Sequence, residues 1–158
     1  MEKLSLILWR ERELLELLAY KLEIERMVLG SGHSRWLNQA NKEVEDVLVT
    51  LRETEVLRAM AADEAALAVG LDPNPSLSGL AEATVEPWRT ILLEHRDAFL
   101  VTTREIAELS DANRGLLTAG YRSAHETLLA IRGTAEGYTP DGTAVAAAPT
   151  RRLLDRSL

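Results

Sequence analysis

The sequence contains no cysteine, and this absence removes several kinds of chemistry at once. Disulfide bonds, zinc sites built from thiolates and cysteine nucleophiles are all excluded. Aromatic residues make up only 4% of the 158 residues, so the core must be built mainly from leucine, alanine, valine and isoleucine. Such an aliphatic composition favours helices over strands, because leucine and alanine are strong helix formers.

The sequence also has no long uninterrupted apolar run. Nothing in it approaches the run of about eighteen apolar residues that a membrane-spanning helix needs, so we expect no membrane insertion. Charged residues from Arg10 to Glu13 interrupt the first apolar residues, which is untypical of a signal peptide. A formal net charge of −7 repels phosphate groups, so we expect no nucleic-acid binding. These absences predict a soluble, cytoplasmic protein.

Four helical segments follow from the spacing of the apolar residues and from the positions of glycine and proline. They cover about 3–29, 35–69, 76–82 and 85–132, with Ser34, Ser76 and Thr84 as the expected N-caps of the last three. Short turns make consecutive long helices antiparallel neighbours. The last helix would be longer than a compact domain of this size is wide. We therefore expect an all-α, elongated antiparallel three-helix bundle, or long helical hairpin, with coiled-coil-like packing over residues 1–132.

Residues 133–158 have a different composition. They are rich in glycine, alanine, threonine and proline, and they show no sustained amphipathic period. Such a segment cannot bury enough apolar surface to order itself, so we expect a flexible C-terminal tail.

The first helix carries two apolar stripes instead of one. At alternating spacings of four and three, the first stripe is Leu4, Leu8, Glu11, Leu15, Leu18, Leu22, Glu25 and Leu29. The second stripe is Leu6, Trp9, Glu13, Leu17, Tyr20, Ile24 and Met27. Because residues advance about 100° along a helix, the two stripes lie on nearly opposite sides. Either this helix is central in a bundle, or one stripe is a docking face for another protein. The sequence does not say which stripe faces inward.

Similar repeats run along the other two long helices. In the second, the stripe is Leu37, Ala40, Val44, Val47 and Leu51, and it continues through Leu57, Met60, Ala61 and Leu67, with the charged Glu64 among them. In the last, the seam is His95, Phe99, Thr102, Ile106, Leu109, Asn113, Leu116 and Gly120, with Leu117, Tyr121, Ala124 and Leu128 on an adjoining face. This alternation of four and three residues is typical of coiled-coil packing.

The sequence shows no pattern typical of a catalytic or metal site. A di-iron bundle needs glutamate three residues before histidine, and none of His33, His95 and His125 has one there. No glycine-rich phosphate loop or nucleophile elbow is present. His95 lies on the seam, where we expect a hydrogen-bonded core histidine. We expect no catalytic residues, no metal or other cofactor and no enzyme activity; a bundle enzyme of an unfamiliar type stays an alternative.

The surplus of apolar surface favours a protein whose function is contact with other proteins. In helix-in-groove recognition, an amphipathic helix of the partner buries its apolar face between helices of the receptor. This burial contributes about 25 cal/mol per Å² of apolar area, less the cost of ordering the guest. The alternative is a self-associating coiled coil without an export role, in which the extra stripe is a homodimer interface.

Three stretches resemble the FlgN family of flagellar export chaperones, in a form similar to its actinobacterial members. They are the opening helix from Leu6 to Leu29, ANRGLLTAGYRSAHETLLAI from Ala112 to Ile131, and YTPDGT from Tyr138 to Thr143. The second stretch has the Asn-x-x-Leu-Leu that the family carries late in its last long helix. The third is similar to the family's Tyr-Gly-x-Asp-Gly, although Thr139 and Pro140 depart from it.

The resemblance implies a cytoplasmic type III export chaperone that binds the hook–filament junction proteins FlgK and FlgL and delivers them to the export gate protein FlhA. It places Asn113, Leu116 and Leu117 in a cargo-binding helix, and Tyr138, with Asp141 and Gly142, at a gate-docking tail. The cargo-binding residues expected from the stripes and the resemblance together are Leu6, Trp9, Leu17, Tyr20, Ile24, Met27, Asn113, Leu116, Leu117, Tyr121 and Leu128. Alternatively, Asn113 fixes the register of two packed helices, and Tyr138 is a tail residue without a role.

Overall fold

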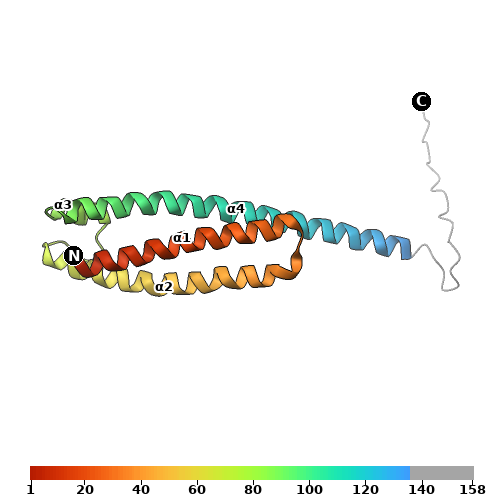
Figure 1. The fold of residues 1–158 in the computed structure, drawn as a ribbon, viewed down its shortest axis with the longest axis horizontal. Helices are drawn as coiled ribbons and strands as arrows, with labels where there is room; N and C mark the ends of the chain where they lie inside the picture. The colour runs from red at the N-terminus through yellow and green to blue at the C-terminus, as the bar shows by residue number, and fades with distance from the viewer. Residues whose placement is uncertain (136–158) are drawn as a thin grey trace, which may run out of the picture. The chain divides into compact units, whose positions relative to one another are not determined.

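The computed structural model describes residues 1–135, and the regular structure among them is helical. The elements are α1 (Glu2–Ser31), the 3-10 helix η1 (Ser34–Trp36), α2 (Leu37–Ala68), α3 (Leu77–Ala83) and α4 (Trp88–Ala135) (Figure 1). The chain divides into two units, Met1–Leu117 and Thr118–Leu158, so α4 contributes residues to both. The predicted all-α class is confirmed.

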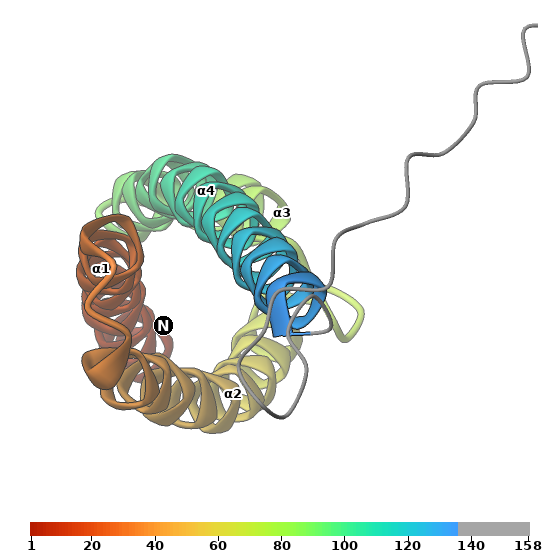
Figure 2. The ribbon, with the colours of Figure 1, turned by 90° about the vertical axis from the view of Figure 1, so that its right-hand side faces the viewer.

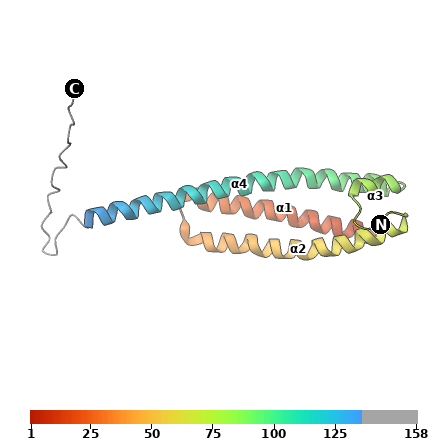
Figure 3. The ribbon, with the colours of Figure 1, turned by 180° about the vertical axis from the view of Figure 1, so that it is seen from behind.

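Within the first unit, α1 packs against both α2 and the part of α4 that precedes residue 118. Figures 1 and 3 show α1 between these two helices in views from opposite sides, and Figure 2 shows α1 next to each of them. α2 runs antiparallel to α1. α4 runs parallel to α1, since Trp9 contacts His95 and Leu22 contacts Asn113. The three long helices form a bundle in which α1 touches both others.

The turn between α1 and α2 is built differently from the prediction. α1 ends at Ser31, and Gly32 follows with the left-handed φ of 70° that glycine adopts without strain. Ser34 does not cap α2, because it begins η1, and α2 starts only at Leu37 without a side-chain cap. The residue before α2, Trp36, already has a helical backbone, so η1 leads directly into the helix.

The two N-caps predicted for the region before α4 have different outcomes. Ser76 caps α3, since its Oγ accepts a hydrogen bond of 3.0 Å from the N–H of the third residue after it. Thr84 does not cap α4, because its hydroxyl donates to the carbonyl of Leu80 at the end of α3. Instead, Oε2 of Glu86 accepts from the backbone N–H of Thr90 at 3.3 Å and from its hydroxyl at 2.8 Å. A carboxylate at this position also suits the positive end of the helix dipole.

The core of the first unit consists of two clusters of buried side chains. One contains Leu4, Leu8, Ala61, Ala62, Ala65, Ala66, Leu80, Ala81 and Leu92. The other contains Leu14, Leu15, Leu18, Ala19, Leu22, Val44, Val47, Leu51 and Leu109. Phe99 of α4 packs against both clusters and so connects them. The buried members of both clusters are aliphatic, as the composition predicts.

The second half of α2 turns a different face inward from the one predicted. Of the predicted positions Ala61 is buried, but Leu57, Met60 and Leu67 are exposed, and Ala62, Ala65 and Ala66 are buried in their place. Small side chains let the neighbouring helices approach closely, and the leucines at 80 and 92 fill the remaining space in this cluster. In this half of α2, Leu57, Met60 and Leu67 therefore remain on the outer face.

Candidate functional site

The two stripes of α1 have opposite environments. The first stripe is the buried one, and its buried members are Leu4, Leu8, Glu11, Leu15, Leu18, Leu22 and Glu25. The second stripe is open: Leu6, Trp9, Leu17, Tyr20 and Met27 are exposed and Ile24 is half-buried. Adjacent residues show the contrast, since Leu17 is 41% exposed and Leu18 is 4% exposed. Within the described residues, α1 thus uses one apolar face for the core and leaves most of the other exposed.

The two carboxylates in the buried stripe are each held by a neighbouring helix. Glu11 forms an ion pair with Arg58 of α2, with 2.8 Å between Oε2 and Nε. Burial raises the pKa of the Glu11 carboxyl, and the positive charge of Arg58 opposes this rise. Glu25 accepts a hydrogen bond of 2.8 Å from the side-chain amide of Asn113 in α4. These partners explain how a stripe with two acidic positions can face the core.

Asn113, one of the predicted cargo-binding residues, lies inside the bundle. Its side chain is 3% exposed, and its Nδ2 donates to the carbonyl of Leu22 at 2.9 Å as well as to Glu25. This geometry fits the alternative interpretation, in which the asparagine fixes the register of two packed helices. Asn113 therefore does not belong to the exposed surface of the first unit.

Asn113→Ala should lower the free energy of unfolding by about 1–3 kcal/mol, because two buried acceptors, the Leu22 carbonyl and the Glu25 carboxylate, lose their donor. Urea denaturation followed by circular dichroism measures this change. Asn41→Ala is the matched control, since it removes an exposed amide that donates to Glu45, and it should change the free energy by less than about 0.5 kcal/mol. Equal, small effects of both substitutions would show that Asn113 does not hold the helices together.

The indole of Trp9 is fixed from two sides although it is 51% exposed. The guanidinium of Arg12 lies 4.7 Å from the ring centroid. The ring of His95 meets the indole edge-on, with 5.0 Å between centroids and 78° between planes. A side chain that is already immobilised loses little conformational entropy when a partner covers it. Trp9 is therefore a preorganised element of the exposed face.

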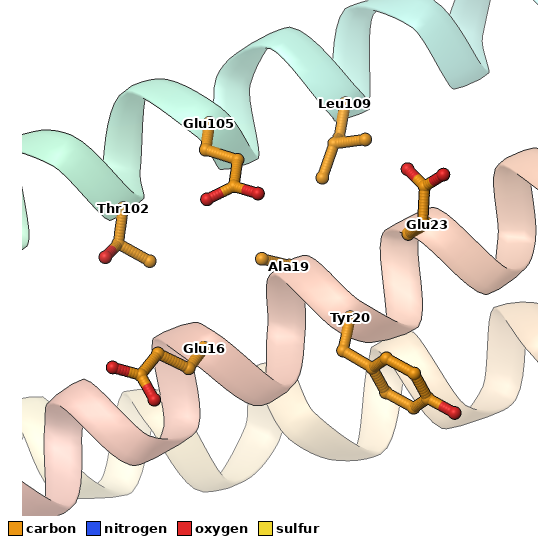
Figure 4. A pocket seen from close by; sticks show the side chains of 7 residues that line it. All are labelled: Glu16, Ala19, Tyr20, Glu23, Thr102, Glu105 and Leu109. Atoms are coloured by element: carbon orange, nitrogen blue, oxygen red, sulfur yellow. The ribbon is translucent and has the colours of Figure 1, made fainter.

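A hollow of about 350 Å³ opens beside Tyr20, between α1 and α4 of the first unit. It is lined by Glu16, Ala19, Tyr20, Glu23, Thr102, Glu105 and Leu109. Figure 4 shows Leu109 of α4 pointing toward Ala19 of α1, with Glu16 and Glu105 to one side and Glu23 to the other. The hollow thus combines an apolar floor with an acidic rim.

A second hollow, of about 460 Å³, lies at the turn that joins α1 to α2. It is lined by Ile24, Met27, Val28, Ser31, His33, Arg35 and Trp36, so it brings two residues of the exposed stripe next to an exposed indole. The guanidinium of Arg35 lies 4.7 Å from the Trp36 ring centroid. The sequence reasoning missed Trp36. Its signal is an aromatic residue four positions after Gly32 that belongs to no predicted stripe.

The other predicted cargo-binding residues of α4 are exposed. Leu116 and Leu117 lie at the end of the first unit, whereas Tyr121 and Leu128 belong to the second. The rings of Tyr121 and His125 stack with 6.4 Å between their centroids. Every residue from 114 to 132 is exposed, so this stretch of α4 offers apolar side chains to a partner.

Three further predictions concern chemistry, membranes and the tail. Among the described residues, no group of three or more His, Asp or Glu side chains is placed to hold a metal ion. No helix in residues 1–135 is long and apolar enough to cross a membrane. Tyr138, Asp141 and Gly142, the residues predicted to dock at the export gate, lie outside the described residues.

A helical protein with exposed apolar faces is well suited to binding other proteins. The family described as FlgN protein matches residues 1–146, which is most of the chain. The chain belongs to the FlgN family. FlgN proteins are flagellar export chaperones, so the predicted family and its general role are confirmed. No curated protein and no solved structure matches the chain.

Proposed function

We propose that this FlgN chain is a cytoplasmic chaperone that binds hook–filament junction proteins of the FlgK and FlgL type and delivers them to the export gate protein FlhA. It binds its cargo through the exposed apolar residues of α1 and of α4. The observation that carries this proposal is the second, uncovered apolar face of α1, because a helix needs only one such face to fold into its own core.

The residue types on the exposed face of α1 suit a binding surface. Trp9 and Tyr20 are aromatic side chains of the kind that dominates binding energy in many interfaces. Met27 is flexible and polarisable, so it can adapt to more than one cargo helix. Covering such residues contributes about 25 cal/mol per Å² of apolar area, less the cost of ordering the cargo segment.

The hollow beside Tyr20 indicates the charge of the cargo segment that fits there. Glu23 already has a partner, since its Oε1 lies 2.6 Å from Nη2 of Arg26. Within residues 1–135, Glu16 and Glu105 form no ion pair, and both carboxylates border the apolar floor. A cargo helix with lysine or arginine beside its apolar residues is therefore complementary to this part of the surface.

The late part of α4 supplies a second set of contacts. Within the second unit, Tyr121 and Leu128 lie seven residues apart, so they share one side of the helix. Both are exposed. An amphipathic helix of the cargo can bury this side as well, in the same mode of recognition.

The test is to mix the full chain with a purified FlgK-type protein and to measure masses by sedimentation. We expect a monomer that forms a one-to-one complex with the FlgK-type protein. A tight homodimer that does not bind this protein would support the alternative, a coiled coil whose extra stripe serves self-association.

Deleting the chain from Gly137 onward should leave the affinity for the FlgK-type protein within about twofold of that of the full chain, because the exposed residues of α1 and α4 are retained. Export of the cargo should nevertheless fall, since Tyr138 and its neighbours are proposed to dock at the gate. Calorimetry measures the affinity, and the amount of cargo in the growth medium measures export. Full export by the truncated protein would exclude a targeting role for the tail, and a large loss of affinity would place part of the cargo site there.

A further inference from the structure

His95 is a buried histidine without a hydrogen-bond partner. Its side chain is 1% exposed and lies between α1 and α4. Within the described residues, neither Nδ1 nor Nε2 meets a donor or acceptor, so the predicted hydrogen bond of this core histidine is absent. The ring packs edge-on against Trp9 and nearly parallel to Phe99, with 6.2 Å between the centroids of the latter pair. Buried polar groups normally have partners, so this imidazole needs an explanation.

The charges around His95 do not favour an imidazolium. Arg12 of α1 faces it with a positive charge, and Glu94 of its own helix is the acidic group that acts on it. Burial, followed by the charge of Arg12, lowers the pKa of His95 below its ordinary value of 6.5. The neutral ring is therefore the form that the folded bundle accommodates at neutral pH.

Three carboxylates of α1 and α2 in this part of the bundle already have partners. Arg58 pairs with Glu11, and Glu64 lies 2.8 Å from Nζ of Lys3. Asp63 accepts a hydrogen bond of 2.6 Å from the backbone N–H of Asn74. None of these carboxylates is thus available to stabilise a positive charge on His95 without giving up an existing contact.

We propose that His95 makes the packing of α4 on α1 sensitive to pH. Its protonation in mild acid loosens the contact between these two helices next to Trp9. An imidazolium has two donors, and at this position it meets the rings of Trp9 and Phe99, the positive charge of Arg12 and, within residues 1–135, no hydrogen-bond partner. The negative charge of Glu94 favours the imidazolium less than burial and Arg12 disfavour it. Opening the α1–α4 contact to water is the change that solvates the charge. Because Trp9 lies on the exposed face of α1, the opening alters the surface that we propose for cargo. The opening itself does not depend on the proposed function.

The sign of the effect follows from proton binding. The open form binds a proton with the ordinary pKa of histidine, whereas the closed form binds it only at lower pH. Lowering the pH below about 6.5 therefore raises the opening constant, by up to about tenfold per pH unit for one proton. Above that pH, both forms carry a neutral ring, and the opening constant does not change with the protonation of His95.

The experiment is amide hydrogen exchange of the full chain without any partner, from about pH 8 to about pH 5.5, corrected for the intrinsic pH dependence of exchange. Opening constants of amides in 90–100 and 5–12 should rise by up to about tenfold per pH unit below pH 6.5, and those around Val44 and Val47 should rise less. The range stops above the sequence pI of about 5.0, near which loss of net charge favours association.

Two variants and one control decide the result. His95→Phe keeps an aromatic ring without a titratable group, and it should abolish the rise. His95→Gln serves the same purpose if the phenylalanine variant does not fold. His125→Gln removes an exposed histidine of the second unit and should keep the rise. Opening constants independent of pH in the unaltered chain, a rise equal over the whole unit, or a rise that persists in both His95 variants would overturn the proposal.

Discussion

Leu18→Glu should lower the free energy of unfolding by more than about 3 kcal/mol, whereas Leu17→Glu, one residue earlier, should lower it by less than about 1 kcal/mol. Leu18 belongs to a buried cluster with Val47 and Leu109. A glutamate there would lose the apolar contacts and would bury a charge without a partner. Leu17 is exposed, so its replacement removes little burial. Leucine and glutamate have similar helix propensities, so the local helix contribution is nearly equal in the two variants.

Urea denaturation followed by circular dichroism measures both free energies. The pair is informative because the two residues have the same type and lie in the same turn of α1, so they differ mainly in burial. Losses of similar size would mean that both stripes are buried, and the exposed face of α1 would then not be a binding surface. A loss at Leu17 larger than that at Leu18 would invert the assignment of the two faces.

The two stripes of α1 could be predicted from the sequence, but which of them faces the core could not. Alternating spacings of four and three identify two faces on any helix. The choice between them depends on groups far away in the chain. Glu11 and Glu25 argue against burial of the first stripe until Arg58 and Asn113 are known to reach them from α2 and α4. A pattern within one helix contains no information about these partners.

The wrong predictions for the inner face of α2 and for the N-caps have a similar origin. Leucine is the side chain that sequence reasoning places in the core first. The inner face of the second half of α2 is nevertheless made of alanine, because close approach of the helices favours small side chains there. Ser34 and Thr84 are good N-caps in isolation, but one begins a 3-10 helix and the other bonds back to α3. Capping preference describes a residue at a helix end and does not fix where the helix begins.

The candidate site was predictable to the extent that it follows from helix periodicity. The exposed members of the second stripe share the face that the spacing gives them, and Leu117 and Leu128 are exposed on the adjoining face of α4. Leu116, which the spacing put on the packed seam, is exposed instead. The burial of Asn113 and the exposed indole of Trp36 depend on how the helices pack and turn, which the spacing does not determine. Of the exposed apolar side chains of α2, Met60 was placed in the inward stripe by its spacing, and Val56 was not singled out because it belongs to no repeat.

Replacing Leu17 and Tyr20 together by glutamine should weaken the binding of a FlgK-type protein at least about tenfold, which corresponds to about 1.4 kcal/mol. Both side chains are exposed, so the urea midpoint and the helical circular dichroism signal should stay close to those of the unaltered chain. Glutamine removes apolar contact area without adding charge. The net charge of −7 and the acidic rim near Tyr20 are thus unchanged, and a loss of affinity reports on apolar contact rather than on electrostatics.

The matched control for this variant is Val56→Gln combined with Met60→Gln. These two residues are also exposed and apolar, but they belong to α2 and line neither hollow. Calorimetry should give the control pair an affinity within about twofold of that of the unaltered chain. If both pairs lose the same affinity, binding depends on general surface hydrophobicity, and α1 has no special role. If neither pair loses affinity, the cargo is bound elsewhere. The late part of α4 is then the next surface to test, because Leu117, Tyr121 and Leu128 can be replaced by glutamine in the same way.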